Sequence, residues 1–144
     1  MWIILALVSA LVTGLSAVVS KIGLSKVDSS AAFAVQSIVI LVLSWTYALA
    51  TGKTKELVRL EIKDWGYLLL AGGVTTVAYL FYFGAIKAGD VSRVAPVDRL
   101  SLVFSIIFAA VFLSEKITTP VLVGGGLMVI GALIVAASGP TGAG

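Results

Sequence analysis

Long apolar runs separated by short charged segments dominate the sequence. Each run is about 20 residues long, which is the length that a helix needs to cross the hydrocarbon core of a bilayer. The pattern therefore predicts an all-α integral membrane fold with five transmembrane helices. The expected spans are approximately 2–20, 31–51, 65–86, 94–113 and 119–138.

Little of the chain is left for a soluble domain. We expect a single five-helix membrane domain over residues 1–138, followed by a flexible tail over residues 139–144. The first run lacks a basic segment before it and is longer than the apolar part of a signal peptide, so we expect it to be retained as a span. The longest connection, Gly52–Asp64, carries most of the loop charge, and its spacing allows a short interfacial helix.

Composition agrees with this fold and limits the chemistry. The chain is 60% hydrophobic and 12% charged, and its mean hydropathy is +1.14. It contains no Cys and no His, which removes disulfides, thiolate nucleophiles and the commonest zinc ligands. We therefore expect neither a metal nor a cofactor, and no motif indicates an enzyme. The net charge of +3 is expected to meet anionic lipid headgroups rather than nucleic acid.

The basic residues do not define one orientation. The positive-inside rule counts Lys and Arg in short loops, and here the two sides carry five and four, with Arg99 just inside a span. One interpretation is dual topology, in which copies insert both ways and pair antiparallel; the other is that a weak bias still fixes one orientation. We favour dual topology, because many transporters consist of two inverted repeats. The two sets are Lys53, Lys55, Arg59, Lys63 and Lys116 on one side, and Lys21, Lys26, Lys87 and Arg93 on the other.

Three spans carry polar residues along one helical face, at spacings of three and four. We interpret these stripes as three walls of a polar crevice. The alternative is that the hydroxyl groups bond to their own helix or to a neighbouring one. The stripes are Ser9, Thr13, Ser16 and Ser20; Gly72, Thr75, Tyr79 and Tyr82; and Asp98, Ser101 and Ser105.

From these stripes we select residues that could line a substrate cavity. Gln36 in the second span is added, although an amide in a membrane helix can equally bond a neighbouring helix. The candidate lining residues are Ser16, Gln36, Tyr79, Tyr82, Asp98, Arg99 and Ser101.

Asp98 and Arg99 are the strong charges that lie well inside an apolar run. Ionisable groups in a membrane are costly and usually face the bundle interior, water or a partner. If the helix starts at Pro96, Asp98 lies in its first turn, where the helix dipole favours an anion, and Arg99 can reach the headgroups. A binding role is the other interpretation. Asp98 and Glu115 are our candidates for proton or ion coupling.

Small residues suggest where helices pack or bend. Gly124 and Gly131 share one face of the last span, and Gly125, Ala132 and Ala136 share another. Small residues let helix backbones approach closely. Gly72, Gly73 and Pro96 are expected points of close approach or flexing.

The segment Phe83–Ser101, which reads FGAIKAGDVSRVAPVDRLS, resembles the junction between the third and fourth helices of EamA domains. The later segments FLSEKIT, at residues 112–118, and GGGLMVIGAL, at residues 124–133, are similar to the end of that domain. EamA domains belong to the drug/metabolite transporter (DMT) superfamily, and the resemblance covers nearly the whole chain.

Typical members of that superfamily carry two EamA repeats, ten helices in all, with inverted halves around a central cavity. The resemblance implies that this chain is one such repeat. It implies a transporter of small metabolites or drug-like molecules that works by alternating access, here as a dual-topology antiparallel homodimer in the inner (plasma) membrane. Related small multidrug-resistance exporters use a Glu in the first helix, and residues 2–20 contain no ionisable side chain. The alternatives are one half of a heterodimeric transporter, and an accessory or assembly membrane protein without transport activity.

Overall fold

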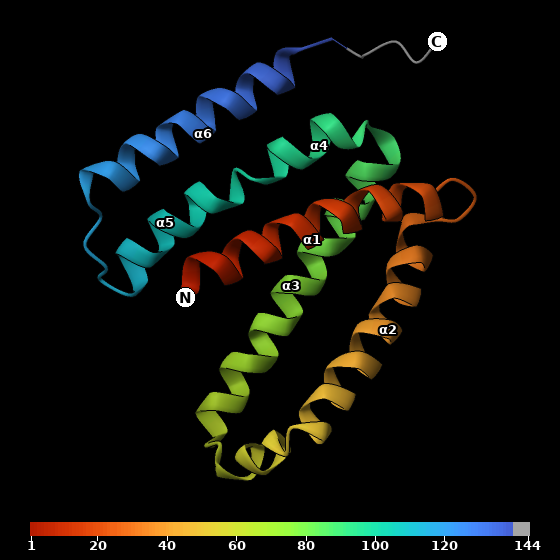
Figure 1. Cartoon of the computed structure of the whole chain (residues 1–144), viewed down its shortest axis with the longest axis vertical. Coiled ribbons are helices and arrows are strands. Elements are labelled where there is room, and N and C mark those ends of the chain that lie inside the picture. The colour runs from red at the N-terminus through yellow and green to blue at the C-terminus, as the bar shows by residue number, and fades with distance from the viewer. Residues whose placement is uncertain (140–144) are drawn as a thin grey trace. The chain divides into compact units, whose positions relative to one another are not determined.

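A computed structural model describes residues 1–139, and residues 140–144 of the expected tail lie outside the described part. The described residues form helices connected by short loops, with no strand among them (Figure 1). The elements are α1 (Trp2–Gly23), α2 (Ser29–Ala50), the 3-10 helix η1 (Lys53–Arg59), α3 (Ile62–Ala88), α4 (Val91–Asp98), α5 (Ser101–Phe112) and α6 (Thr119–Ala137).

Among residues 1–139, five helical segments are long and apolar enough to cross a membrane. Four of them are single helices, and the fourth segment in chain order, Val91–Phe112, consists of α4 and α5 together. The all-α, five-span prediction is therefore confirmed. The short helix that the spacing allowed within Gly52–Asp64 is present as η1.

The chain divides into two compact units. The first, which we call the terminal unit, comprises Met1–Lys21 and the chain from Ala88 onward, and so contains nearly all of α1 together with α4, α5 and α6. The second, the central unit, comprises Ile22–Lys87 and contains α2, η1 and nearly all of α3.

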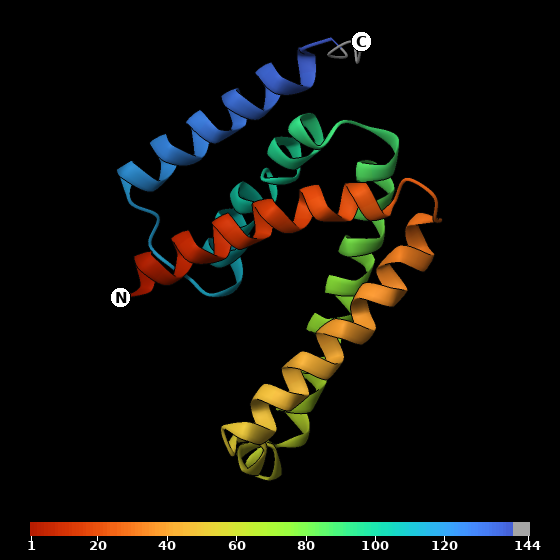
Figure 2. The same ribbon diagram turned by 45° about the vertical axis from the view of Figure 1, so that its right-hand side comes forward.

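In the terminal unit, α6 packs against both α4 and α5, and it runs beside them in both ribbon views (Figures 1 and 2). The contact face of α6 includes Gly125 and Ala132, both of which are buried. A Cβ at Gly125 would lie 3.5 Å from Cδ1 of Ile106 on α5. Small residues therefore allow α6 to pack closely, as expected. The residues at the contact are Gly125 and Ala132, whereas Gly131 is exposed in the single chain.

Span four is interrupted between α4 and α5. Leu100 donates its N–H to the carbonyl of Val97 at 3.0 Å, and Leu102 donates to that of Arg99 at 3.0 Å. These bonds reach back three residues, so the usual bonds to the carbonyls of Pro96 and Asp98 are not formed. The result is a tight turn at Arg99 and Leu100 inside the span.

The helix does not start at Pro96, so the interpretation in which Asp98 is a first-turn residue is wrong. Asp90 precedes the first helical residue, Val91, and its carbonyl accepts the N–H of Val94 at 2.9 Å. Pro96 therefore lies inside α4, where a proline removes one backbone bond and crowds the preceding turn. Asp98 is the last residue of α4 instead of a first-turn residue, so the helix dipole does not favour an anion at this position.

The helices of the central unit begin and end with recognisable caps. Asp28 is the N-cap of α2, and its carboxylate accepts the backbone N–H of Ser30 at 2.9 Å. Gly52 follows the end of α2 with a φ of 68°, a left-handed conformation that glycine adopts without steric cost. Asp64, in the first turn of α3, accepts the N–H of Glu61 at 3.0 Å. Polar caps thus fix where α2 and α3 start.

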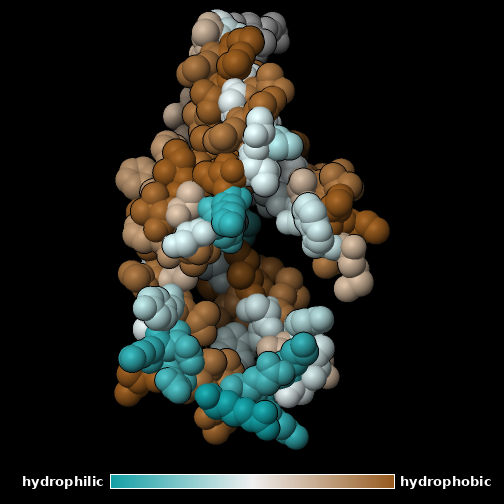
Figure 3. All heavy atoms as spheres, turned by 90° about the vertical axis from the view of Figure 1, so that its left-hand side faces the viewer, coloured by the Kyte–Doolittle hydropathy of each residue, from teal (hydrophilic) through white to brown (hydrophobic). Residues whose placement is uncertain are grey.

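Very little of the apolar surface is buried within a single chain. The buried hydrophobic residues in the described part are Ala17, Leu24, Phe83, Ile86 and Ala132, and no buried polar residue is found there. Hydrophobic residues cover most of the face shown in Figure 3, and hydrophilic ones gather in patches, one of them at the lower end, where η1 lies. In a bilayer these apolar faces are available to lipid or to another helix bundle.

Candidate substrate-binding site

Four aromatic rings form a cluster in the central unit. The ring of Phe33 on α2 stacks on Tyr79 of α3, with centroids 5.6 Å apart and planes 9° from parallel. Phe33 also contacts Phe83, at a centroid distance of 5.5 Å. Tyr82 meets both Tyr79 and Phe83 edge-on, at 6.4 and 6.5 Å. All of these distances lie in the range of favourable aromatic pairs. We call Phe33, Tyr79, Tyr82 and Phe83 the aromatic cluster.

The sequence explains why these rings meet. Tyr79, Tyr82 and Phe83 are three and four residues apart, so they share one face of α3. Phe83 is 3% exposed and Tyr79 is 39% exposed, so the cluster has a buried base and an accessible ring. Such a surface can bind a flat, partly apolar group by stacking.

Three of the residues selected from the sequence belong to this region. Tyr79 and Tyr82 are in the cluster, and Gln36 follows Phe33 by three residues on the same half-buried side of α2. Phe33 and Phe83 were missed, because the selection considered polar stripes. Their spacing from Gln36 and Tyr79 was the available signal, since both lie on the same faces as residues already selected.

The least exposed side of α1 is its hydroxyl stripe. Thr13, Ser16 and Ser20 are half-buried and Ala17 is buried, while most of the remaining residues of α1 are exposed. The hydroxyl of Thr13 donates to the carbonyl of Ser9 at 2.7 Å, and the hydroxyl of Ser105 on α5 donates to that of Ser101 at 2.9 Å. These two hydroxyl groups follow the alternative interpretation, in which they bond to their own helix.

Asp98, Arg99 and Ser101 surround the turn between α4 and α5. All three are exposed, and Asp98 and Arg99 form no ion pair with each other in the described structure. Arg93, nearer the start of α4, donates to the carbonyl of Ala136 near the end of α6 at 3.3 Å. The turn thus presents the carboxylate of Asp98 and the guanidinium of Arg99 beside backbone carbonyls that lack their usual helical hydrogen bonds. The hydrogen bond from Arg93 connects α4 to α6.

The selected residues are divided between the two units. Gln36, Tyr79 and Tyr82 belong to the central unit, where the fold brings them to the aromatic cluster. Ser16, Asp98, Arg99, Ser101 and Glu115 belong to the terminal unit, and Glu115 lies in the loop between α5 and α6.

Lysines at the ends of α1 and α3 bond to loop carbonyls. In the terminal unit, Lys21 donates to the carbonyl of Gly89 at 2.9 Å. In the central unit, Lys87 donates to the carbonyl of Val27 at 2.8 Å and lies 3.9 Å from the carboxylate of Asp28. Hydrogen bonds from the hydroxyl and N–H of Ser30 lower the pKa of Asp28, and the charge of Lys87 lowers it further.

Comparison with known proteins gives a family. No solved structure shows a significant match to the chain. A protein described as "Uncharacterized transporter in cobO 3'region", from Sinorhizobium sp, is 36% identical over 135 residues, which cover 94% of this chain and 96% of that protein. The model of the EamA-like transporter family matches residues 1–137. Together with its five membrane-length helices, this match shows that the chain belongs to the EamA-like transporter family and is a multi-pass membrane protein.

Proposed function

We propose that the protein transports a small, partly apolar metabolite by alternating access, as a dual-topology antiparallel homodimer in the inner (plasma) membrane. Family membership is the observation that carries the transport activity, and it favours a transporter over an enzyme. The dimer rests on the number of spans and on the balance of basic residues.

An odd number of spans makes inversion simple. A five-helix copy inserted the other way round is the inverted partner that many transporters contain as a second repeat. The related protein is covered over 96% of its length, so it too is of single-repeat size. The nearly equal numbers of basic residues on the two sides favour insertion in both orientations, and the exposed apolar faces of the single chain offer surface for a partner.

The aromatic cluster is our proposed contact for the apolar part of the substrate. Tyr79 supplies an accessible ring and Gln36 an amide close by on α2. In the terminal unit, Asp98 and Arg99 at the turn in span four are our proposed contacts for a charged or zwitterionic group, with Ser16 and Ser101 as further polar lining.

Alternating access needs parts that move and parts that stay fixed. The turn after Pro96 allows α5 to change its angle to α4, while the bond from Arg93 to Ala136 holds α4 on α6. Gly72 and Gly73 are further flex points within α3. Asp98 and Glu115 are the carboxylates proposed for proton or ion coupling, since both are exposed and neither is paired in the described structure.

Cysteine labelling tests the orientation of the chain in the membrane. The natural chain contains no Cys, so an introduced thiol is the one site in the chain that is labelled. Ser25→Cys and Val58→Cys place a thiol in loops on opposite sides of the membrane and leave every lysine and arginine in place. Under dual topology, a membrane-impermeant maleimide applied to intact cells labels about half of each variant. Full labelling of one variant and none of the other contradicts dual topology.

Reconstitution tests the transporter itself. The purified chain is placed alone in lipid vesicles, and uptake is measured for a panel of small metabolites with planar and polar parts. Uptake by this single chain supports the homodimer. Activity that appears only after a second five-span protein is added supports a heterodimer, and no uptake under either condition supports an accessory protein.

A further inference from the structure

The loop between α5 and α6 folds back over the end of α5. Ser114 adopts a φ of 55°, and it is the one non-glycine residue with positive φ in the described part of the chain. This left-handed conformation is costly for a residue with a side chain. Leu113 and Glu115 both donate their N–H to the carbonyl of Ala109, at 3.0 and 3.3 Å. The turn therefore returns Glu115 and Lys116 toward α5.

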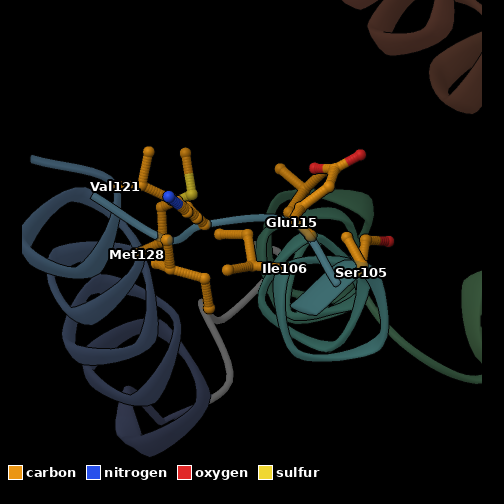
Figure 4. Close-up of a pocket in the computed structure, with 9 residues that line it drawn as sticks. Ser105, Ile106, Glu115, Val121 and Met128 are labelled. Carbon is orange, nitrogen blue, oxygen red and sulfur yellow. The ribbon is translucent and has the colours of Figure 1, made fainter. Parts of the chain in front are cut away.

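A pocket of about 480 Å³ lies between α5 and α6 beside this loop. Figure 4 shows Ile106 pointing from α5 toward α6, Val121 and Met128 on the side of α6, and Glu115 on the side of α5. The hydroxyl of Ser105 already donates to the carbonyl of Ser101, so the walls offer mainly apolar contact. The apolar lining consists of Leu102, Ile106, Ala109, Ile117, Val121 and Met128.

The polar edge of the pocket carries two opposite charges. Glu115 and Lys116 line it, both are exposed, and neither forms an ion pair or a side-chain hydrogen bond within residues 1–139. Both follow directly after the apolar helix α5, at the depth where lipid headgroups meet the hydrocarbon core. An apolar slot with one free anion and one free cation at its end is complementary to a molecule with an apolar chain and a zwitterionic head.

We propose that this pocket binds a zwitterionic aminophospholipid. One acyl chain occupies the space between α5 and α6, the phosphate pairs with Lys116, and the ammonium group pairs with Glu115. Bound lipid then leaves Asp98 as the carboxylate for proton or ion coupling. The pocket volume lies within the range of sites for small molecules. A purely anionic headgroup satisfies Lys116 but places like charge beside Glu115, so phosphatidylethanolamine is preferred over phosphatidylglycerol.

Native mass spectrometry of the purified protein tests the proposal. The protein is incorporated in bilayers of equal parts phosphatidylethanolamine and phosphatidylglycerol and then released into detergent, and the retained lipid is identified. We expect phosphatidylethanolamine to be enriched. Lys116→Ala should lower its retention about fivefold, and Met128→Trp should lower it by filling the pocket. Lys53→Ala and Leu133→Trp, which change a loop lysine and an α6 residue outside the pocket, are the matched controls.

Glu115→Gln distinguishes the roles of the two charges, because it removes the negative charge and keeps that of Lys116. It should leave total lipid retention near that of the natural chain while the preference for phosphatidylethanolamine disappears. The proposal is overturned if both lipids are retained equally by the natural chain, or if Lys116→Ala and Met128→Trp retain as much phosphatidylethanolamine as their controls. It is also overturned if Met128→Trp changes the oligomeric state and leaves lipid retention unchanged, because a second copy then covers the pocket.

Discussion

At the residue scale, the most informative side chains are those that meet a partner far away in sequence. Phe33 and Tyr79 stack across two helices, and no periodicity of a single helix reveals such a contact. The sequence indicated Tyr79 and Tyr82 because their hydroxyl groups interrupt an apolar face. Phe33 and Phe83 have the same hydropathy as residues that face lipid. Their spacing places them on the faces of Gln36 and Tyr79, but their contact with each other became visible only when α2 and α3 were placed side by side.

Tyr79→Ala should weaken transport more than Tyr79→Phe. The phenylalanine keeps the stacked ring, whereas alanine removes an aromatic contact whose contribution corresponds to a twofold to tenfold change in apparent affinity, or roughly 0.5–1.5 kcal/mol. The measurement is the substrate concentration for half-maximal uptake in vesicles. Tyr67→Ala, which removes an exposed tyrosine near the start of α3, is the control. Equal uptake by Tyr79→Ala and the natural chain would remove the aromatic cluster from the proposed site.

Asp28 makes the stability of the folded chain depend on pH. Because its pKa is lowered in the folded chain, its contribution is fully present above the ordinary carboxyl pKa of about 3.9 and is lost as the pH falls through the lower folded value. Asp28→Ala should therefore melt at a lower temperature than the natural chain at pH 7, and the difference should shrink in strong acid. Thermal unfolding in detergent across this pH range is the measurement. Glu56→Gln, at an exposed acid on η1, should leave the natural acid dependence intact.

At the element scale, the apolar runs were sufficient to predict five spans, because bilayer thickness fixes the length of a helix that crosses it. Pro96 was an expected flex point of span four, but the tight turn at Arg99 and Leu100 was not predicted. It depends on where the helix begins: a proline at a first turn is harmless, whereas a proline six residues into a helix is disruptive. Asp90 and the bond from Val94 to its carbonyl decide this, and a run of hydropathy values does not distinguish the two cases.

Pro96→Ala should make span four more regular. Alanine restores an N–H and removes the clash with the preceding turn, a change of about 3 kcal/mol in favour of a continuous helix. We expect a higher melting temperature and a slower transport rate, measured on the same purified variant. Pro120→Ala is the control, because Pro120 lies in the first turn of α6, where no helical bond from its nitrogen is needed. Unchanged transport by Pro96→Ala would argue against flexing at this turn.

At the scale of the whole molecule, the outstanding property is how little of the apolar surface one chain buries. Hydrophobicity predicts which segments enter the bilayer, but it does not say which face meets lipid and which meets protein, because both surroundings are apolar. This is why the sequence predicts the spans, whereas the lining residues stay a prediction. The sequence predicted the stripe of α1 that is half-buried. It placed small residues on two faces of α6, and it did not decide that α6 packs through the face of Gly125 and Ala132.

A pair of charge-biased variants tests the antiparallel homodimer as an assembly. Lys53→Ala with Lys55→Ala shifts the basic residues toward one side, and Lys26→Ala with Val58→Lys shifts them toward the other. Each variant alone should insert in one orientation and lose transport, whereas coexpression of the two should restore it. Uptake in cells is the measurement. Full activity of either variant alone would show that a single orientation is sufficient.

The bond between Arg93 and the carbonyl of Ala136 has a consequence for the order in which the chain is built into the membrane. The segment that contains α4 carries Arg93, Asp98 and Arg99, and charged residues oppose entry into lipid. Its ties to α6 form only once α6, the later segment, has itself been synthesised and inserted. Span four should therefore settle in the bilayer last, together with the helix that follows it, and a released chain that ends before residue 119 should leave α4 outside the lipid.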